Sequence, residues 1–508
     1  MLHQLLIVTA LTPPSAHVAP APRVGAPGPR AGPAHMLTPV GVMPFRSPLQ
    51  KTSPPEPNPR EHKAEACILP TTPREQVSSR TRAAGAADGG LELSPPPAGA
   101  PLEPPPPFTK DFSKPMAVPA AGIEAAVEVM RSGRLFRYCA VDSQVALAES
   151  EFAQMVDQKY ALGVNSCSSA IMLALMVVGV AAGDRVLTNG FTFTALPSTI
   201  MRLHAEPVLV EATDQWTMDL DDLERKAAAS GATVLLLSHM RGKVADMDRV
   251  ADICQRHGLR LVEDCAHSCG VKWRGRQLGY HGEVAAYSTQ SDKVINSGEG
   301  GFLTTNDGGL MAKAIYLSGC YERRYAKHGT PPPKELCEAA MMEMPNLSCR
   351  MNEVTAACVR PLIANLDARV VEYNDRYAVV VNILREQAGD HIVVPEQLPQ
   401  VSSVGDHLNF YLRGVTAEQN TLFHEVCTSM GVPVSYFRSP VNARWHVNWR
   451  KYGSPTYELP QVDSLLATAY DLKLPPYFAA ADFAHLAQVI AYAANVAVGR
   501  AGNADVSI

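Results

Sequence analysis

The sequence predicts an α/β fold with a mainly parallel sheet and helices on both faces. Short apolar runs with the length of strands alternate along the chain with longer stretches that have helical spacing. The expected strands cover residues 160–164, 185–187, 207–210, 234–237 and 259–262. The expected helices cover residues 169–180, 195–203, 220–229 and 247–257. Such alternation indicates a parallel sheet, which binds its ligands beyond the carboxyl ends of its strands.

Composition divides the chain of 508 residues into two parts. Residues 1–107 hold 24 of the 41 prolines and show no apolar period. A segment of this kind buries too little surface to offset the entropy of ordering it, so we expect a disordered leader. An ordinary globular pattern begins at Phe108, and a chain that starts near this residue is expected to fold and to be active.

The leader has several interpretations. Four basic residues precede its first acidic residue, Glu56, which is the composition of an organelle transit peptide. The short apolar run Leu5–Leu11 fits the core of a secretory signal instead. A plain extension, or translation from a later methionine, also fits. We expect an intracellular, soluble protein, in the cytoplasm or in an organelle if the leader is a transit peptide.

The net charge, the apolar runs and the cysteines indicate which partners and which compartment to expect. The formal net charge of -5 provides no positive field for a nucleic-acid backbone, so nucleic acid is not an expected partner. No run of apolar residues reaches the ~20 that a membrane-spanning helix needs, so no membrane span is expected. The 11 cysteines form no CxxC pair, which is typical of reduced intracellular thiols.

Two polar segments follow expected strands. Residues 165–169 read Asn-Ser-Cys-Ser-Ser and lead into a helix, whose first N–H groups suit a phosphate. Simple capping of the helix by Ser166 or Ser168 also explains them. Asp264 ends a buried strand, where its carboxylate needs a positive partner, although a strand-end cap or a structural salt bridge would satisfy it too. The histidine and cysteines that follow lack a fourth ligand, so no metal is expected.

A third segment contains an unusual lysine. Lys293 lies among small polar residues and precedes the glycine-rich turn Gly298–Gly301. A lysine held in a pocket with a lowered pKa can form a Schiff base. The alternative is an ordinary exposed lysine, which would not need the small polar residues and the glycines around it.

Several motifs together resemble those of the DegT/DnrJ/EryC1/StrS aminotransferases. The motifs are Asp264–His267, Gly275–Gly279, Ser288–Lys293, Gly298–Gly301 and Leu472–Pro476. The resemblance covers roughly Ser132 to the end of the chain. It implies fold type I of the pyridoxal-phosphate enzymes, with a mainly parallel seven-stranded sheet in the large domain and a smaller α+β domain. We expect an N-terminal arm and large domain in residues 108–385 and the small domain in residues 386–508.

The resemblance also implies roles for residues around the cofactor ring. Lys293 would hold pyridoxal 5'-phosphate as an aldimine and then move the substrate proton as a general acid and base. Asp264 would pair with the pyridine nitrogen, and His267 would bond the ring hydroxyl. Phe193 would stack on the ring, unless it is only a core residue at the start of a helix. Ser288, Ser168 and the adjacent Ser169 would bind the phosphate.

The sequence departs from the family pattern at three positions. Cys167 replaces a glycine, which makes the turn less free. Ser348 stands where the family has an asparagine that reaches the phosphate of the neighbouring subunit, and Asn346 is an alternative for that role. Arg438 replaces a tyrosine. A guanidinium there suits the carboxylate of an amino donor, although a solvated surface arginine is equally consistent with the sequence.

The resemblance implies an aminotransferase that moves an amino group from an amino acid, typically glutamate or glutamine, to a keto-sugar or cyclic ketone. It also implies a homodimer with shared active sites. Other reactions of the same cofactor remain as alternatives: decarboxylation, dehydration and desulfuration, the last with Cys320. Lys293 argues against the dehydratase branch, which has histidine there. A non-catalytic protein that binds the cofactor is the remaining alternative.

Overall fold

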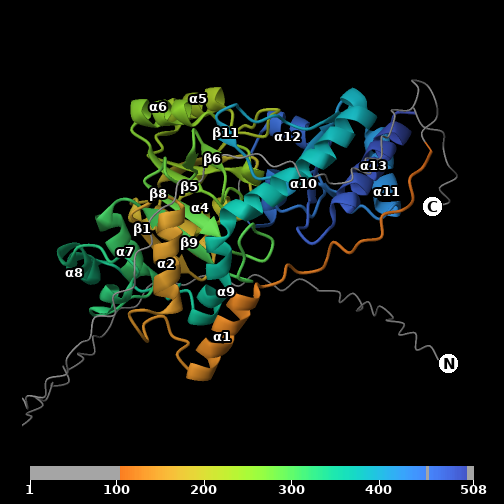
Figure 1. Cartoon of the computed structure of the whole chain (residues 1–508). Helices are drawn as coiled ribbons and strands as arrows, with labels where there is room; N and C mark the ends of the chain where they lie inside the picture. Colours follow the sequence, from red (N-terminus) through yellow and green to blue (C-terminus); the bar gives the residue numbers. More distant parts are fainter. Residues whose placement is uncertain (1–102, 453–456, 500–508) are drawn as a thin grey trace, which may run out of the picture. The chain divides into compact units, whose positions relative to one another are not determined.

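The computed structural model describes residues 103–452 and 457–499 (Figure 1). Most of the expected leader, residues 1–102, therefore lies outside the described residues. The fold is built on a seven-stranded sheet in which only β9 runs antiparallel to its neighbours. The strand order is β1 (Tyr160–Val164), β9 (Gly301–Thr305), β8 (Val284–Ser288), β5 (Arg260–Asp264), β4 (Val234–Ser238), β2 (Arg185–Asn189) and β3 (Glu206–Val210). The predicted α/β fold with a mainly parallel sheet is confirmed.

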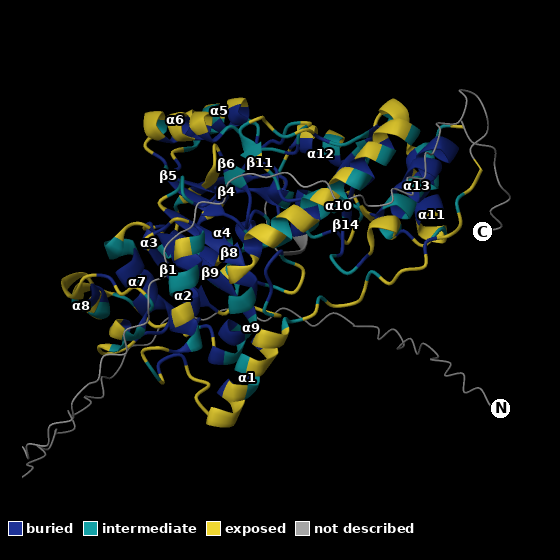
Figure 2. Ribbon diagram, in the orientation of Figure 1, coloured by how far each residue is buried: buried dark blue, intermediate teal, exposed yellow. Residues whose placement is uncertain are grey.

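Helices cover both faces of this sheet, because successive strand residues point to opposite sides. In β4, Leu235 and Leu237 enter one apolar core, whereas Val234 and Leu236 enter the other. The first core is closed by α2 (Gln144–Met155), α5 (Leu220–Ser230), α6 (Met247–His257) and α9 (Glu353–Ala364). The second is closed by α3 (Cys167–Val177), α4 (Ala195–Arg202), α7 (Gly308–Ser318) and α8 (Lys334–Glu343). Figure 2 shows the buried strands between helices whose outer faces are exposed.

A second, antiparallel sheet follows in the sequence. Its strands are, in order, β10 (Ile392–Val393), β12 (His407–Leu412), β14 (Ala469–Lys473) and β13 (Ser435–Tyr436). Its apolar core includes residues of α10 (Leu366–Gln387), α11 (Ala417–Ser429) and α13 (Ala480–Ala497). Because α10 contributes Tyr373 to the first core and Leu384 to this one, it connects the two layers. The expected domain boundary at residue 385 lies near the end of α10 and stays a prediction.

Several shorter elements complete the fold. They are β6 (Lys272–Trp273), β7 (Arg276–Gln277) and β11 (Val401–Ser402), which form a small sheet, then α12 (Pro460–Leu466) and the 3₁₀ turns η1 (Met240–Gly242), η2 (Arg324–Lys327), η3 (Gly389–His391) and η4 (His446–Tyr452). None of the helices in residues 103–452 and 457–499 is long and apolar enough to cross a membrane.

The segment before α1 (Ala120–Ser132) packs against the helices of the second sheet (Figure 1). The N–H of Phe108 donates to the carbonyl of Met430 at 2.8 Å, and the ring of Phe108 lies 5.6 Å from that of Phe478. Phe112 lies edge-on to the same ring at 5.0 Å. Further along the chain, α1 packs on α9. Nε2 of His485 also contacts the carbonyl oxygen of Pro106 at 2.7 Å, so the arm is anchored from Pro106 onward, two residues before the predicted start of the globular pattern.

Candidate active site

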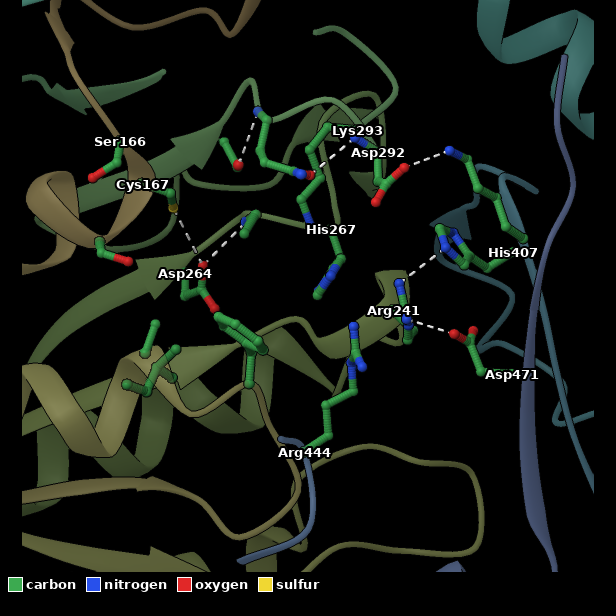
Figure 3. A pocket seen from close by; sticks show the side chains of 18 of the residues that line it. Ser166, Cys167, Arg241, Asp264, His267, Asp292, Lys293, His407, Arg444 and Asp471 are labelled. Atoms are coloured by element: carbon green, nitrogen blue, oxygen red, sulfur yellow. Dashed lines mark hydrogen bonds and ion pairs between the residues drawn. The ribbon is translucent and has the colours of Figure 1, made fainter. Parts of the chain in front are cut away.

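A cavity of about 600 Å³ lies at the carboxyl ends of β5 and β8 (Figure 3). Residues of the second sheet, including His407 and Asp471, complete its lining. Six of the predicted site residues line this cavity: Lys293, Asp264, His267, Ser288, Ser168 and Phe193. Its size suits a small molecule, and its many charged and hydroxyl side chains suit a polar one.

Asp264 is a buried carboxylate at the end of β5. Its Oδ2 accepts a hydrogen bond from the hydroxyl of Ser238 at 2.8 Å, and its Oδ1 accepts one from the N–H of Ala266 at 3.1 Å. Burial raises the pKa of Asp264, although these hydrogen bonds and the charge of Lys293 partly oppose the rise. Because a buried carboxylate is stabilised by a cation that is hydrogen-bonded to it, the site suits a protonated ring nitrogen.

Lys293 faces the same cavity from the loop after β8 (Figure 3). Burial and, to a smaller extent, the positive charge of Arg241 lower the pKa of its amine to about 8. A substantial fraction of the amine is therefore neutral at mildly basic pH. A neutral amine can act as a nucleophile or as a base.

His267 and Phe193 provide the groups that a flat ring needs. Burial, with help from Lys293 and Arg241, lowers the pKa of His267 well below its usual value, so the imidazole is neutral. A neutral imidazole has one nitrogen that donates and one that accepts, so it can form a hydrogen bond with a ring hydroxyl. Phe193 lies just before α4 and keeps 41% of its surface exposed, which is unusual for a large apolar residue and leaves a ring face open for stacking.

The side of the cavity next to Asp264 is formed by the N-terminus of α3. Ser166 is the N-cap, and its hydroxyl accepts a hydrogen bond from the N–H of Ser169 at 3.1 Å. The hydroxyl of Ser169 donates to Asn165 at 2.7 Å, so Ser169 does not line the cavity, whereas Ser168 and Ser288 do. Hydroxyls beside a helix N-terminus suit a phosphate.

Cys167 borders this end of the cavity. Its Sγ lies 3.9 Å from Oδ1 of Asp264. Burial, together with the charge of Asp264, raises the pKa of the thiol well above its usual value, so the sulfur stays protonated. The cysteine therefore occupies the family's glycine position without adding a charge to the site.

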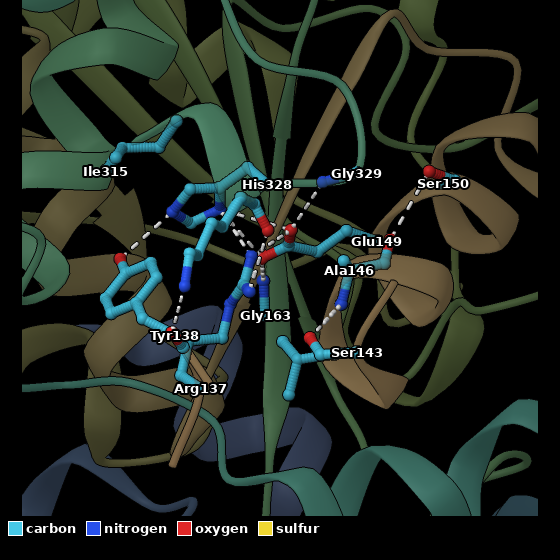
Figure 4. Close-up of polar contacts among 12 residues, drawn as sticks. Arg137, Tyr138, Ser143, Ala146, Glu149, Ser150, Gly163, Ile315, His328 and Gly329 are labelled. Carbon is cyan, nitrogen blue, oxygen red and sulfur yellow. Dashed lines mark hydrogen bonds and ion pairs between the residues drawn. The ribbon is translucent and has the colours of Figure 1, made fainter. Parts of the chain in front are cut away.

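The strand that carries this turn is fixed by a buried polar network (Figure 4). Glu149 on α2 accepts hydrogen bonds from Nη2 of Arg137 at 2.7 Å and from the N–H of Gly163 on β1 at 3.0 Å. Nδ1 of His328 lies 3.1 Å from the same carboxylate, and the N–H of Gly329 donates to it at 3.1 Å. Since β1 leads directly into residues 165–169, the network helps to position the N-terminus of α3.

Glu149→Gln is expected to lower the free energy of unfolding by about 3–5 kcal/mol, because it leaves the buried Arg137 without its anion. Glu151→Gln is the control: this carboxylate is partly exposed, pairs with Arg360 at 2.6 Å and contributes at most ~1 kcal/mol. Urea unfolding followed by tryptophan fluorescence measures both variants. Equal stability of the two variants would show that the network does not stabilise the fold.

The same network predicts a pH dependence of stability. Burial would raise the pKa of Glu149, but Arg137 and His328 outweigh it and hold the pKa below its usual value. Burial lowers the pKa of His328. Both groups bind fewer protons in the folded state than in the unfolded state, so stability falls as the pH falls, first below ~6.5 and further below ~4.3.

Besides Ser169, two further predicted residues do not line the cavity. Ser348 is exposed, and its hydroxyl accepts a hydrogen bond from Nη2 of Arg350 at 2.7 Å, while the amide of nearby Asn346 donates to Cys320 at 3.4 Å. Arg438 is exposed, and its guanidinium lies 5.6 Å from the ring centre of Trp445. The structure does not bring Ser348 or Arg438 to the cavity of their own chain.

Several charged residues in the lining were not predicted. Arg241 follows β4 with a φ of 54°, and its guanidinium contacts Nε2 of His407 at 3.0 Å and Oδ2 of Asp471 at 2.5 Å. Nζ of Lys473 pairs with Asp292, the neighbour of Lys293, at 2.6 Å. Arg444 precedes η4 and lies over the ring of Phe193 at 5.8 Å. The local signals were the motif Leu472–Pro476, which contains Lys473, and the motif Ser288–Lys293, which contains Asp292.

The lining fits pyridoxal 5'-phosphate. A buried carboxylate, an amine with a lowered pKa and an exposed aromatic face line the cavity. Hydroxyl groups and the N-terminus of α3 lie beside the carboxylate. This is the set of groups that a cationic ring, an aldehyde and a phosphate need.

One buried group has the ligand types of a metal site. In the described residues, one ligand atom each from His239, Glu263 and Cys265 lies within 4.8 Å of the others. Glu263 is already bonded to His239 at 2.9 Å and to the N–H of Gly279 at 3.0 Å. These partners account for its burial without a metal.

Residues 119–490 match the family model of the DegT/DnrJ/EryC1/StrS aminotransferases. The chain belongs to this family. It is therefore an aminotransferase that uses pyridoxal 5'-phosphate, and the predicted enzyme class and cofactor are confirmed.

The chain is similar to several known proteins of this family. The L-glutamine:2-deoxy-scyllo-inosose aminotransferase of Streptoalloteichus tenebrarius is 30% identical over 65% of this chain and 78% of its own length. A pleiotropic regulatory protein of Geobacillus stearothermophilus is 32% identical over 53% of this chain and 68% of its own. With other curated relatives the match spans about half of their length.

Solved structures show the same fold. The structure of S. venezuelae DesV in complex with a ketimine intermediate superimposes with a TM-score of 0.62 and 28% identity, covering 74% of this chain and 94% of that one. The predicted fold type I is thereby confirmed.

Proposed function

We propose that this aminotransferase takes its amino group from glutamine or glutamate and transfers it to a cyclic ketone or keto-sugar. The observation that carries the site assignment is the meeting of Lys293, Asp264 and the exposed ring of Phe193 in one cavity. The substrate classes are supported by the names of relatives, which include L-glutamine:scyllo-inosose aminotransferase of Streptomyces griseus and GDP-perosamine synthase of Caulobacter vibrioides.

Each residue around the ring has a separate task in this proposal. The bound cofactor supplies an electron sink for the carbanion formed at the substrate carbon. Lys293 holds the cofactor and moves the proton to and from that carbon, a task suited to an amine with a pKa of about 8. Asp264 keeps the ring nitrogen protonated, and His267 orients the ring hydroxyl. Phe193 stacks on the ring and limits the access of water.

The phosphate would be held at the N-terminus of α3. Ser168 and Ser288 are placed to donate their hydroxyls, and Ser169 supports the turn through its bond to Asn165. The backbone N–H groups of the first turn add their dipole. The Glu149 network keeps the end of β1, and with it this turn, in place.

A second copy of the chain would complete the site. Ser348 belongs to an exposed patch that includes Phe136 and Tyr321, which keep 41% and 39% of their surface exposed. Arg350 links the patch, because it bonds Ser348 and lies 5.6 Å from the ring centre of Phe136. Exposed aromatic residues of this kind mark interaction surfaces. We infer a homodimer in which Ser348 or Asn346 faces the partner's phosphate site, with twice the chain mass of 54.7 kDa in sedimentation.

A regulatory, non-catalytic function is the second candidate, because one relative is named a pleiotropic regulatory protein. The retained Lys293 and Asp264 favour catalysis. For desulfuration, Cys320 would have to reach the substrate, but it is buried and its Sγ contacts the carbonyl of Tyr321 at 4.0 Å. It does not line the cavity.

A substrate panel tests the proposed function. Purified protein with bound cofactor is incubated with glutamine or glutamate and with inosose ketones or nucleotide-linked keto-sugars, and amino products are identified by mass spectrometry. We expect an amino product with at least one ketone, at a rate that depends on Lys293. Cofactor binding without conversion of any amino acid would support the regulatory candidate instead.

A further inference from the structure

Arg444 differs from the other arginine in the cavity lining. Arg241 is held by Asp471 at 2.5 Å and contacts His407 at 3.0 Å, so its charge is already paired. No carboxylate of residues 103–452 and 457–499 lies within ion-pair distance of Arg444, and its Nε is buried without a hydrogen-bond partner. Its guanidinium lies over the ring of Phe193, 5.8 Å from the ring centre.

The charge of Arg444 is costly in this position. Burial, together with the nearby charge of Arg241, lowers the pKa of its guanidinium to about 10. The group is still a cation at neutral pH, yet it has lost part of its hydration. A partly desolvated cation with free donors is best stabilised by an anion that binds both of its N–H edges.

The position of Arg444 indicates which anion this is. In Figure 3 it lies beside Arg241 and below His267, far from Ser166 and Cys167 at the phosphate end of the cavity. Its ring contact, Phe193, is the residue proposed to stack on the cofactor. Arg444 therefore borders the space where a substrate would lie, and the cofactor phosphate would lie at the other end.

We propose that Arg444 binds the α-carboxylate of the amino donor. This inference rests on the proposed function, because it needs an amino acid as donor. The planar guanidinium suits bidentate contact with a carboxylate, and Arg241 contributes to the positive field while Asp471 holds it in place. The structure thereby assigns to Arg444 the role that the sequence suggested for Arg438, which lies outside the cavity.

The variants Arg444→Met and Arg444→Lys test this role, with Arg438→Met as the matched comparison. The donors are L-glutamine and L-glutaminol, the amino alcohol that lacks the carboxylate. The half-reaction is followed through the absorbance of the bound cofactor. Calorimetric binding of glutarate to the holoenzyme gives a second readout that needs no turnover, and circular dichroism shows that each variant is folded.

Arg444→Met is expected to weaken glutamine and glutarate binding about 10-fold to 100-fold, as for the loss of a charged hydrogen-bond pair, and to leave glutaminol unaffected. The affinity of Arg444→Lys for glutamine and glutarate should lie between that of Arg444→Met and that of the wild type. The affinity of Arg438→Met should match that of the wild type. Unchanged glutamine and glutarate binding in Arg444→Met, or a loss in Arg438→Met instead, would overturn the inference. If the wild type converts no amino acid, the proposed function fails, while the glutarate titration still tests Arg444.

Discussion

Replacement of Lys293 by alanine is expected to reduce turnover by about four orders of magnitude or more. The variant loses both the group that holds the cofactor in position and the base that moves the substrate proton. Turnover is measured with the donor and acceptor pair found in the substrate panel. Cofactor retained after gel filtration is measured by absorbance, and we expect weaker retention than in the wild type.

Lys243→Ala is the matched control for this experiment. Burial lowers the pKa of Lys243 to about 8, as it does for Lys293, but Lys243 does not line the cavity. The two lysines therefore share a lowered pKa, and they differ in whether they line the cavity. We expect Lys243→Ala to retain the cofactor and most of its activity. Turnover by Lys293→Ala at a rate near that of the wild type would refute its assigned role.

The second large effect is expected for Asp264→Asn. Asparagine keeps the shape of the side chain and can still form a hydrogen bond, but it removes the negative charge that keeps the ring nitrogen protonated. The neutral ring accepts electrons poorly, so the step in which the substrate loses its proton should slow by several orders of magnitude. Attachment of the cofactor to Lys293 does not need this charge. The variant should therefore remain yellow while it loses turnover.

Ser238→Ala separates the charge of Asp264 from its hydrogen bonding. It removes the bond at 2.8 Å to Oδ2 and leaves the carboxylate in place, so we expect a decrease of about 10-fold or less. Both variants are compared by single-turnover absorbance after addition of the amino donor. A near wild-type rate in Asp264→Asn would mean that Asp264 is only a structural residue at the end of β5.

The sequence was sufficient for the parts of the site that depend on local pattern. The apolar run before Asp264 fixes it at the carboxyl end of β5, and the edge of a parallel sheet is where ligands bind. The limits of the expected strands agree with the structure within two residues, for example residues 185–187 against Arg185–Asn189. The glycine-rich turn after Lys293 leads directly into β9.

The rest of the site depends on contacts between distant segments, which carry no local signal. Arg241 meets Asp471 across 230 positions of the sequence; Arg241 lies in the turn after β4, and Asp471 lies on β14 of the second sheet. Arg444 lies in an irregular segment, so neither helical nor strand spacing predicts the direction in which its side chain points. Alignment with the family placed Arg438 near the substrate, but five residues of irregular chain separate it from Arg444, the arginine that lines the cavity.

The site of cofactor attachment tests the central claim most directly. The purified protein is reduced with borohydride, which fixes the cofactor to the lysine that holds it, and is then digested and mapped by mass spectrometry. The cofactor mass is expected on the peptide that contains Lys293. A cofactor mass on Lys243, Lys473 or another lysine would contradict the placement of the cofactor in this cavity and the roles derived from it.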